Sequence, residues 1–265
     1  MTAATASPAL PAGAATPGAL TASTAVLKAE AGLFVREPLS LFWVVLFPSV
    51  LLTILGLIPA FRHPDPALGG RRVIDLYVPV TVLLALMTAG IQAMPPVLAG
   101  YRERGILRRM SATPVRPRTL LAAQIVLHGA AALVSVALTL AVGRLAFGVA
   151  LPGRPGGYLL ALLPATLGAL ALGATVAALS RTTKIAGAVA SAVFFPMMFS
   201  AGVWIPVQAM PALLRRIVGF TPFGAGAQAL GQAAAGDWPS WSHLAVVGLW
   251  AVVLTGTASR WFRWA

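Results

Sequence analysis

The six acidic residues are the first candidates for chemistry, because a carboxylate inside a membrane span can exchange its charge for a proton or a cation. None of them lies in the middle of a long apolar run, and Asp75, at the edge of one, comes nearest. Ion-coupled transport is therefore disfavoured. The six residues are Glu30, Glu37, Asp65, Asp75, Glu103 and Asp237.

Other reactive groups are sparse or poorly placed. The sequence has no cysteine, and its three histidines are far apart, so we expect no metal site. Ser200 lies in Met-Phe-Ser-Ala-Gly, which lacks the first glycine of a hydrolase nucleophile elbow. A Walker A loop needs Gly-Lys-Ser/Thr, whereas Lys28 and Lys184 follow leucine and threonine. We therefore expect neither an enzyme nor a bound cofactor in this chain.

The charge of the chain is concentrated in residues 101–120, between two apolar runs of membrane-spanning length. The whole chain is 58% hydrophobic and only 9% charged, against about 25% in a soluble domain, which excludes a soluble fold. Nucleic-acid binding is disfavoured despite the net charge of +13, because arginines beside spans set topology and meet anionic head groups. Against the single acid Glu103, the segment carries Arg102, Arg104, Arg108, Arg109, Arg116 and Arg118.

Part of this segment has the spacing of a short helix. Apolar side chains form one edge among the arginines, and Pro114 and Pro117 end the helix before the next span. A short helix with an apolar edge and a charged rim suits a groove on a soluble partner. A topology signal that contacts only anionic lipid is the simpler alternative. The apolar edge consists of Ile106, Leu107 and Met110.

Six apolar runs are each long enough to cross a bilayer, which takes about 20 helical residues. We expect kinks or breaks at Pro48, at Pro79 and at Pro95-Pro96 in the first two runs. In the fourth run, small residues recur every four positions from Ala161 to Ala177, a stripe that favours close helix packing. The sequence thus predicts an all-α polytopic membrane protein with spans at about 39–60, 75–99, 120–142, 158–179, 185–205 and 242–259.

The segments outside the spans differ in composition. Residues 1–23 are almost all Ala, Thr, Pro, Ser and Gly and predict a disordered cytoplasmic tail. Residues 24–37 suit an amphipathic helix at the membrane surface or a simple lead-in to the first span. Residues 206–241 predict two short re-entrant helices. With the N-terminus inside, the cytoplasmic segments hold most of the nineteen Lys and Arg, so we expect both termini in the cytoplasm.

Residues 102–115 resemble a motif of type-2 ABC exporter permeases. Their Arg-Glu-Arg-Gly-Ile-Leu-Arg-Arg-Met, followed by Ala-Thr-Pro-Val, is similar to the family's Glu-Arg-Glu-(Arg/Lys)-Gly-Thr-Leu-(Arg/Glu)-Arg-Leu…Thr-Pro segment, with Ile106 where threonine is common. The Arg-Glu-Pro-Leu-Ser-Leu-Phe before the first span and the Pro-Met-Met-Phe-Ser-Ala-Gly-Val-Trp-Ile-Pro that ends the fifth are also similar. The resemblance covers about residues 24–264 and points especially to the daunorubicin-type drug-resistance branch.

This resemblance implies a half-transporter. Two six-span permeases would pair, as a homodimer or a heterodimer, above two ATPase subunits that hold ATP and Mg. One ABC type-2 transmembrane domain would occupy residues 24–265, with a coupling loop at 101–118 and an external re-entrant segment at 206–241. The implied ATPase-docking residues are Glu103, Arg104, Gly105, Leu107, Arg108 and Arg109, to which the apolar edge adds Ile106 and Met110. The implied substrate-path residues are Gln92, Met94, Phe194, Phe195, Met198 and Phe199.

We therefore expect a multi-pass permease subunit in a bacterial cytoplasmic membrane that exports a hydrophobic or amphipathic compound, such as an antibiotic, by alternating access. Export of a lipid-linked polysaccharide or lipid is the alternative within transport. A non-transporting membrane scaffold or immunity protein is the alternative outside it. The expected partners are an ATPase subunit, a second permease copy and membrane lipids, with no nucleic acid. For the substrate-path aromatics and methionines, ordinary helix packing is the competing interpretation.

Overall fold

A computed structural model describes residues 19–106, 109 and 117–261 of the chain. Among these residues, six helices are long and apolar enough to cross a membrane, which confirms the predicted all-α polytopic fold. The first two are composite: α2 (Pro38–Leu41), η1 (Phe42–Leu46) and α3 (Phe47–Gly56) form one, and α4 (Val73–Met87), η4 (Thr88–Ala93) and α5 (Met94–Glu103) form the other. The remaining four are α7 (Pro117–Phe147), α8 (Pro155–Leu179), α9 (Thr183–Ala201) and α12 (Trp241–Trp261).

The π-helical segments η1 and η4 each end two residues before a proline, Pro48 and Pro95 respectively. The amide of Phe47 donates to the carbonyl of Phe42, and that of Met94 to Ala89, five residues back in each case. Proline has no N–H and its ring clashes with the preceding turn, which a wider π turn accommodates. The span Val73–Glu103 is continuous through Pro95-Pro96, and also through Pro79, which lies inside α4, although the sequence predicts breaks at these prolines.

The span Val73–Glu103 forms the centre of the molecule. In the most apolar stretch of this span, 94% of the residues are buried, against 33% in α9 and 22% in α12. It packs against α7, α8 and α11. Its closest neighbour is α8, because a Cβ added to Gly173 would overlap the carbonyl oxygen of Gly90. The small-residue stripe of α8 faces this contact region, and Ala161, Ala169 and Ala177 are almost fully buried.

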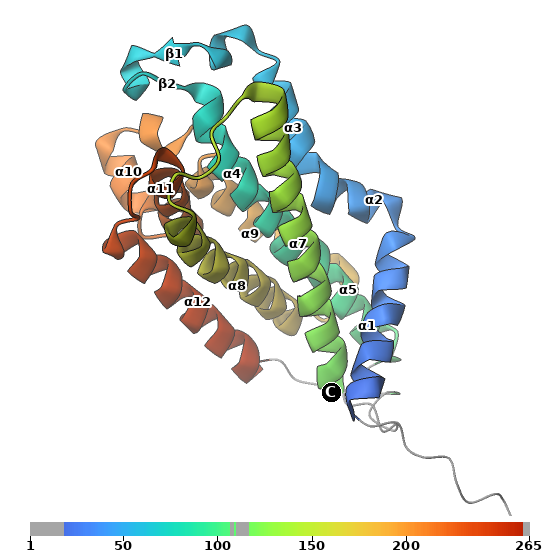
Figure 1. The fold of residues 1–265 in the computed structure, drawn as a ribbon. Coiled ribbons are helices and arrows are strands. Elements are labelled where there is room, and N and C mark those ends of the chain that lie inside the picture. Colours follow the sequence, from blue (N-terminus) through green and yellow to red (C-terminus); the bar gives the residue numbers. More distant parts are fainter. Residues whose placement is uncertain (1–18, 107–108, 110–116, 262–265) are drawn as a thin grey trace, which may run out of the picture.

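Short elements cover the two ends of the helix bundle (Figure 1). The distal end carries η2 (Pro59–Arg62), η3 (Pro66–Leu68), α10 (Ala212–Val218) and a ribbon in which β1 (Pro64–Asp65) pairs antiparallel with β2 (Arg71–Arg72). The opposite, proximal end carries α1 (Ala19–Val35), the end of α5 and the start of α7. The start of the charged segment, at the end of α5, thus lies at the far end of the molecule from α10 and the ribbon.

Two of the described segments outside the spans, around α1 and between α9 and α12, are more helical than their composition suggests. α1 begins at Ala19, inside the predicted tail, because its alanine-rich start favours a helix and the helix packs against α7. Between α9 and α12 the chain forms η5 (Val207–Ala209), α10 and α11 (Pro222–Ala235), so the two predicted short helices are present. α11 inserts into the bundle, where Phe223 and Leu230 are buried.

Candidate functional site

The proximal end holds the predicted docking segment. α5 ends at Glu103, and the chain then turns at Gly105, whose φ of +67° lies in the left-handed region that favours glycine. The amide of Gly105 donates to the carbonyl of Arg102 at 3.0 Å, and the amide of Arg109 donates to Gly105 at 3.1 Å. Three predicted docking residues, Leu107, Arg108 and Met110, lie outside the described residues.

Arg102 and Glu103 join the end of α5 to the loop between α8 and α9. Arg102 Nη1 donates to the carbonyls of Ala177 at 2.9 Å and Ser180 at 2.7 Å, at the C-terminal end of α8. The Glu103 carboxylate accepts from the backbone N–H at 2.9 Å and the hydroxyl at 2.8 Å of Thr183, the first residue of α9. Each charge therefore meets the helix end of opposite polarity. We call this pair the α5 clamp.

The α5 clamp changes the interpretation of Glu103. Its side chain is exposed, as a docking residue requires, but its carboxylate already binds Thr183 within the chain. The sequence shows the two partners separately, as an adjacent Arg-Glu pair at the end of one span and a short basic loop at 180–184 between two others. It does not show that these two segments meet. Contact of Glu103 with an ATPase stays a prediction.

A buried glutamate connects α1 to two spans. Glu30 is 9% exposed, and its Oε2 accepts hydrogen bonds from Tyr101 Oη and Gln124 Nε2, both at 2.6 Å. Tyr101 belongs to α5 and Gln124 to α7. A carboxylate removed from water needs such donors, because an unpaired buried charge is costly. We call Glu30, Tyr101 and Gln124 the α1 node.

Sequence reasoning missed the α1 node, although a signal was present. Glu30 lies four residues from both Val26 and Phe34, so it is on the apolar face of α1. That position brings a polar side chain into the packed interface, where Phe34 also contacts the ring of His128 with centroids 5.7 Å apart. An acid on the apolar face of an amphipathic helix therefore indicates a buried partner.

Of the remaining predicted docking residues, one packs against the bundle and two are exposed. Ile106 is half-buried and packs against Tyr101 and Leu120, so it contributes to the interior as well as to the predicted apolar edge. Arg104 and Arg109 are exposed. The Arg104 guanidinium lies 5.7 Å from the centre of the Tyr101 ring, and Arg109 Nη2 donates to the carbonyl of Arg104 at 3.2 Å. The two arginines give the proximal end a positively charged surface.

The predicted substrate-path residues lie in different environments. Met94, Phe194 and Met198 are buried in the core of the single chain, which is the packing role of the competing interpretation. Phe195 and Phe199 are one helical turn apart and exposed at 57% and 37%.

Gln92 belongs to the central span and contacts α9. Its Nε2 atom donates to Ser191 Oγ at 3.1 Å. Its Oε1 atom is buried and has no hydrogen-bond partner in the described part of the chain. A substrate role for Gln92, or for any of the other five residues, stays a prediction.

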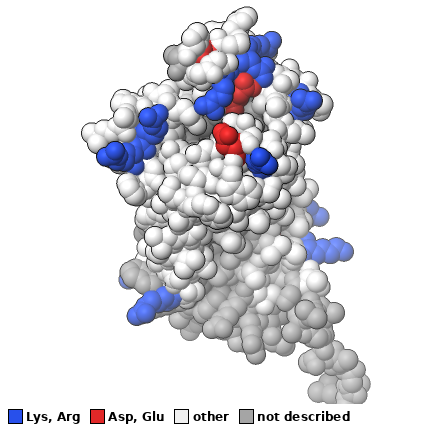
Figure 2. Space-filling view, turned by 60° about the vertical axis from the view of Figure 1, so that its left-hand side comes forward, with Lys and Arg blue, Asp and Glu red and all other residues white. Residues whose placement is uncertain are grey.

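The six spans and the charge distribution define a class of protein. Charged side chains gather at the distal end, and the described surface just below them carries few charges on this face (Figure 2). An uncharged belt between charged ends is what a bilayer requires of a polytopic membrane protein. The chain is therefore a multi-pass membrane protein, with a charged segment joined to its bundle at the proximal end.

The chain belongs to the ABC-2 type transporter family, whose pattern matches residues 21–233. It is accordingly a permease subunit of an ABC transporter, a component of transport and not of catalysis, and the family implies an ATPase partner subunit. A search of curated proteins found no match. The family match does not distinguish branches, so the similarity to daunorubicin-type exporters stays a prediction.

Proposed function

We propose that this permease subunit exports a hydrophobic or amphipathic compound, such as an antibiotic, across a bacterial cytoplasmic membrane. A separate ATPase subunit with bound ATP and Mg would drive it, and two permease copies would enclose the substrate path. The single observation that carries the proposal is the pair of connections at the proximal end. The α5 clamp joins α5 to α8 and α9, and the α1 node joins it to α1 and α7.

These connections provide a route by which a movement of the ATPase subunit reaches the membrane spans. An ATPase that docks on the surface of Arg104 and Arg109 pushes on the turn that follows α5. Because Arg102 and Glu103 hold the α8–α9 loop, the displacement of α5 reaches both of these spans without a flexible step between them. Alternating access then follows from tilting α9 against the central span. The exposed Phe195 and Phe199 give α9 an aromatic face toward substrate or the second permease copy.

The experiment is co-expression with a candidate ATPase, followed by capture of the complex, ATPase assays and drug efflux in cells. Arg109→Gln should weaken capture of the ATPase, because it removes an exposed charge from the docking surface. Glu103→Ala should lower the transport achieved per ATP hydrolysed more than it weakens capture, because α9 is no longer held to α5. Glu103→Gln, which retains an acceptor for Thr183, should have a smaller effect than Glu103→Ala.

Arg144→Gln provides the matched control, because Arg144 is an exposed arginine at the other end of α7. It should behave as wild type in all three assays. The exporter proposal fails if the wild-type chain neither captures an ATPase nor changes drug resistance, which would leave a scaffold or immunity role. Transport of lipid-linked saccharide or lipid without drug efflux would replace the proposed substrate and keep the ATP-driven mechanism.

A further inference from the structure

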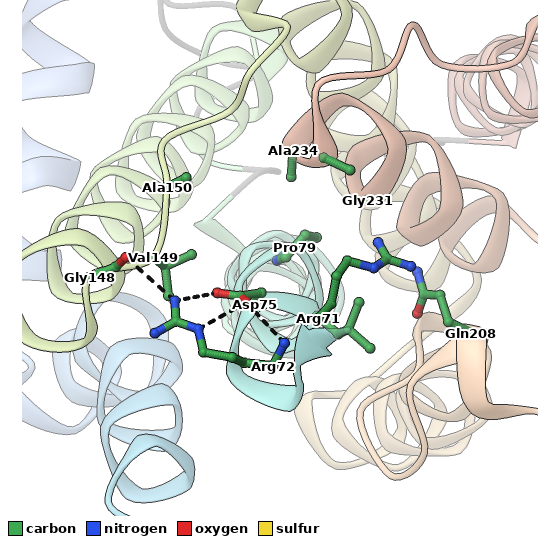
Figure 3. A pocket seen from close by; sticks show the side chains of 12 residues that line it. Arg71, Arg72, Asp75, Pro79, Gly148, Val149, Ala150, Gln208, Gly231 and Ala234 are labelled. Atoms are coloured by element: carbon green, nitrogen blue, oxygen red, sulfur yellow. Dashed lines mark hydrogen bonds and ion pairs between the residues drawn. The ribbon is translucent and has the colours of Figure 1, made fainter. Parts of the chain in front are cut away.

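Two adjoining cavities open at the distal end, remote from the proposed docking surface. Their volumes are about 310 and 540 Å³, within the range of roughly 300–1,000 Å³ typical of ligand pockets. Arg71, Gln208, Gly231 and Ala235 line both cavities, so we treat them as one feature, the distal groove. The part nearest the start of α4 is shown in Figure 3.

The distal groove is built on one face of α11. Gln228, Gly231, Gln232 and Ala235 follow the helical spacing of three, four and seven residues and line its floor. Arg71 of β2 and Gln208 of η5 extend from different elements toward the same space (Figure 3). A Cβ added to Gly231 would lie 3.1 Å from Gln208 Nε2, so the glycine makes room for this amide.

The charges of the groove do not cancel. Arg72 is neutralised by Asp75 at 2.6 Å, and this hydrogen bond raises the pKa of Arg72. Arg71, by contrast, forms no side-chain hydrogen bond or ion pair with any described residue, although Asp65 is its partner across the ribbon. Arg215 has one long hydrogen bond, from Nη1 to the carbonyl of Gln208 at 3.5 Å.

The acid that offsets these two arginines is Asp237, an exposed residue on the wall of the larger cavity. It follows Gly236, whose carbonyl oxygen accepts a hydrogen bond from Arg154 Nε at 3.1 Å. Arg154 is therefore a third cation close to Asp237, which is the one acid in the described lining that has no ion pair. The groove keeps an excess of positive charge.

The amides of the groove also present more donors than acceptors. The Gln232 carbonyl oxygen accepts from the Ser240 amide at 2.8 Å, which commits its acceptor and leaves its NH₂ group for the groove. Gln208 Nε2 lies above Gly231, facing the guanidinium of Arg71 (Figure 3). Two donors that face one another are complementary to an acceptor placed between them. Guanidinium and amide N–H groups in this arrangement match the oxygens of a carboxylate or phosphate.

We propose that the distal groove binds an oxyanion of the phosphate type, held between Arg71 and Arg215 with the amides of Gln208 and Gln232 as neutral donors. Such a group is carried by an anionic lipid head group or occurs free in solution. The proposal is independent of the exported substrate and of the ATPase. It concerns the purified permease alone.

The test uses the full chain purified in detergent and two probes. Phosphatidylglycerol is added at low molar excess and its retention is measured by native mass spectrometry. Inorganic phosphate is titrated by calorimetry. Arg71→Gln and Arg215→Gln should each weaken binding of the responding probe about tenfold, the effect expected for one charge-assisted hydrogen bond. Arg144→Gln removes the same charge from an exposed position outside the groove and should bind as wild type.

Gly231→Ala distinguishes a specific binding site from general electrostatic attraction, because the added methyl group displaces the Gln208 amide and leaves the charge of the groove unchanged. It should weaken binding, and all variants should elute as the wild type does in size-exclusion chromatography. A response to the lipid alone identifies a head group as the ligand, and a response to phosphate identifies the free anion. Binding of neither probe, equal loss in Arg144→Gln, or wild-type binding by both groove arginine variants would overturn the proposal.

Discussion

Two buried tyrosine hydroxyls differ in what they contact. Tyr101 Oη donates to the Glu30 carboxylate at 2.6 Å, whereas Tyr158 Oη is buried without a hydrogen-bond partner in the described part of the chain. Tyr101→Phe should therefore lower the free energy of unfolding by about 1.5–3 kcal/mol, the range for a hydrogen bond to a charged group. Tyr158→Phe removes an unsatisfied polar atom and should be neutral or stabilising.

Thermal unfolding of both variants in the same detergent measures this difference. Tyr101→Phe combined with Glu30→Leu should cost less than the sum of the two single changes, because each removes the same hydrogen bond. Equal melting temperatures for Tyr101→Phe and Tyr158→Phe would show that the α1 node does not stabilise the chain.

At the residue scale, the sequence predicted which segment is charged but not how its charges are used. Composition alone identifies residues 101–120, because one arginine-rich stretch lies between two apolar runs. The roles of Arg102 and Glu103 depend on the ends of α8 and α9, which are about 75–80 positions away in the sequence. A contact over that separation is set by tertiary packing, which no local pattern encodes.

The crossing of the central span with α8 brings two backbones into close contact. Gly173→Ala places a Cβ against the carbonyl oxygen of Gly90, and relief requires the two backbones to separate. The variant should lose at least about 1–3 kcal/mol of stability, as overpacked cores do. Gly168→Ala, in the same helix, meets nothing within 4 Å and should be neutral or more stable by up to about 1 kcal/mol.

The yield of folded, monodisperse protein and its melting temperature distinguish the two glycine variants. A Gly173→Ala chain as stable as Gly168→Ala would mean that α8 and the central span are free to move apart. The stripe from Ala161 to Ala177 predicted this packing correctly, since small residues at every fourth position give a helix a face that others approach closely.

The proline segments were predicted less well. A proline pattern indicates that a normal helical hydrogen bond is missing, and the sequence was accordingly interpreted as kinked or broken. The π turns η1 and η4 retain continuity by shifting the bond to the fifth residue back. The two π turns occur in different surroundings, since η4 lies in a span that is almost wholly buried and η1 in one that is much less buried, so burial alone does not decide where a helix widens at proline.

At the scale of the whole molecule, the two ends should lie on opposite sides of the membrane. The chain has no cysteine, so a single introduced cysteine reports its own accessibility. Arg144→Cys, at the distal end of α7, should react with a membrane-impermeant maleimide in intact cells. Arg109→Cys, in the proximal segment, should react only after permeabilisation. Both positions are exposed, so burial does not protect either one.

The reverse labelling pattern would contradict the orientation expected from the basic residues and would place the ATPase-docking segment outside the cell. Labelling of both cysteines in intact cells would indicate leaky membranes, which a cytoplasmic marker protein controls for. The number and type of spans were predictable because hydrophobic length is a local property. The arrangement of the spans around the central one was not, because each span is apolar on all sides in the sequence.

The central span and α8 meet at two separate points: the Gly90–Gly173 crossing and the contact of Arg102 with the end of α8. Two rigid bodies pinned at two points retain one degree of freedom, which is rotation about the line that joins the pins. The close crossing resists sliding, and the hydrogen bonds of Arg102 resist separation. Apart from that rotation, the central span and α8 should move together, so the opening of a path falls to a less buried span such as α9.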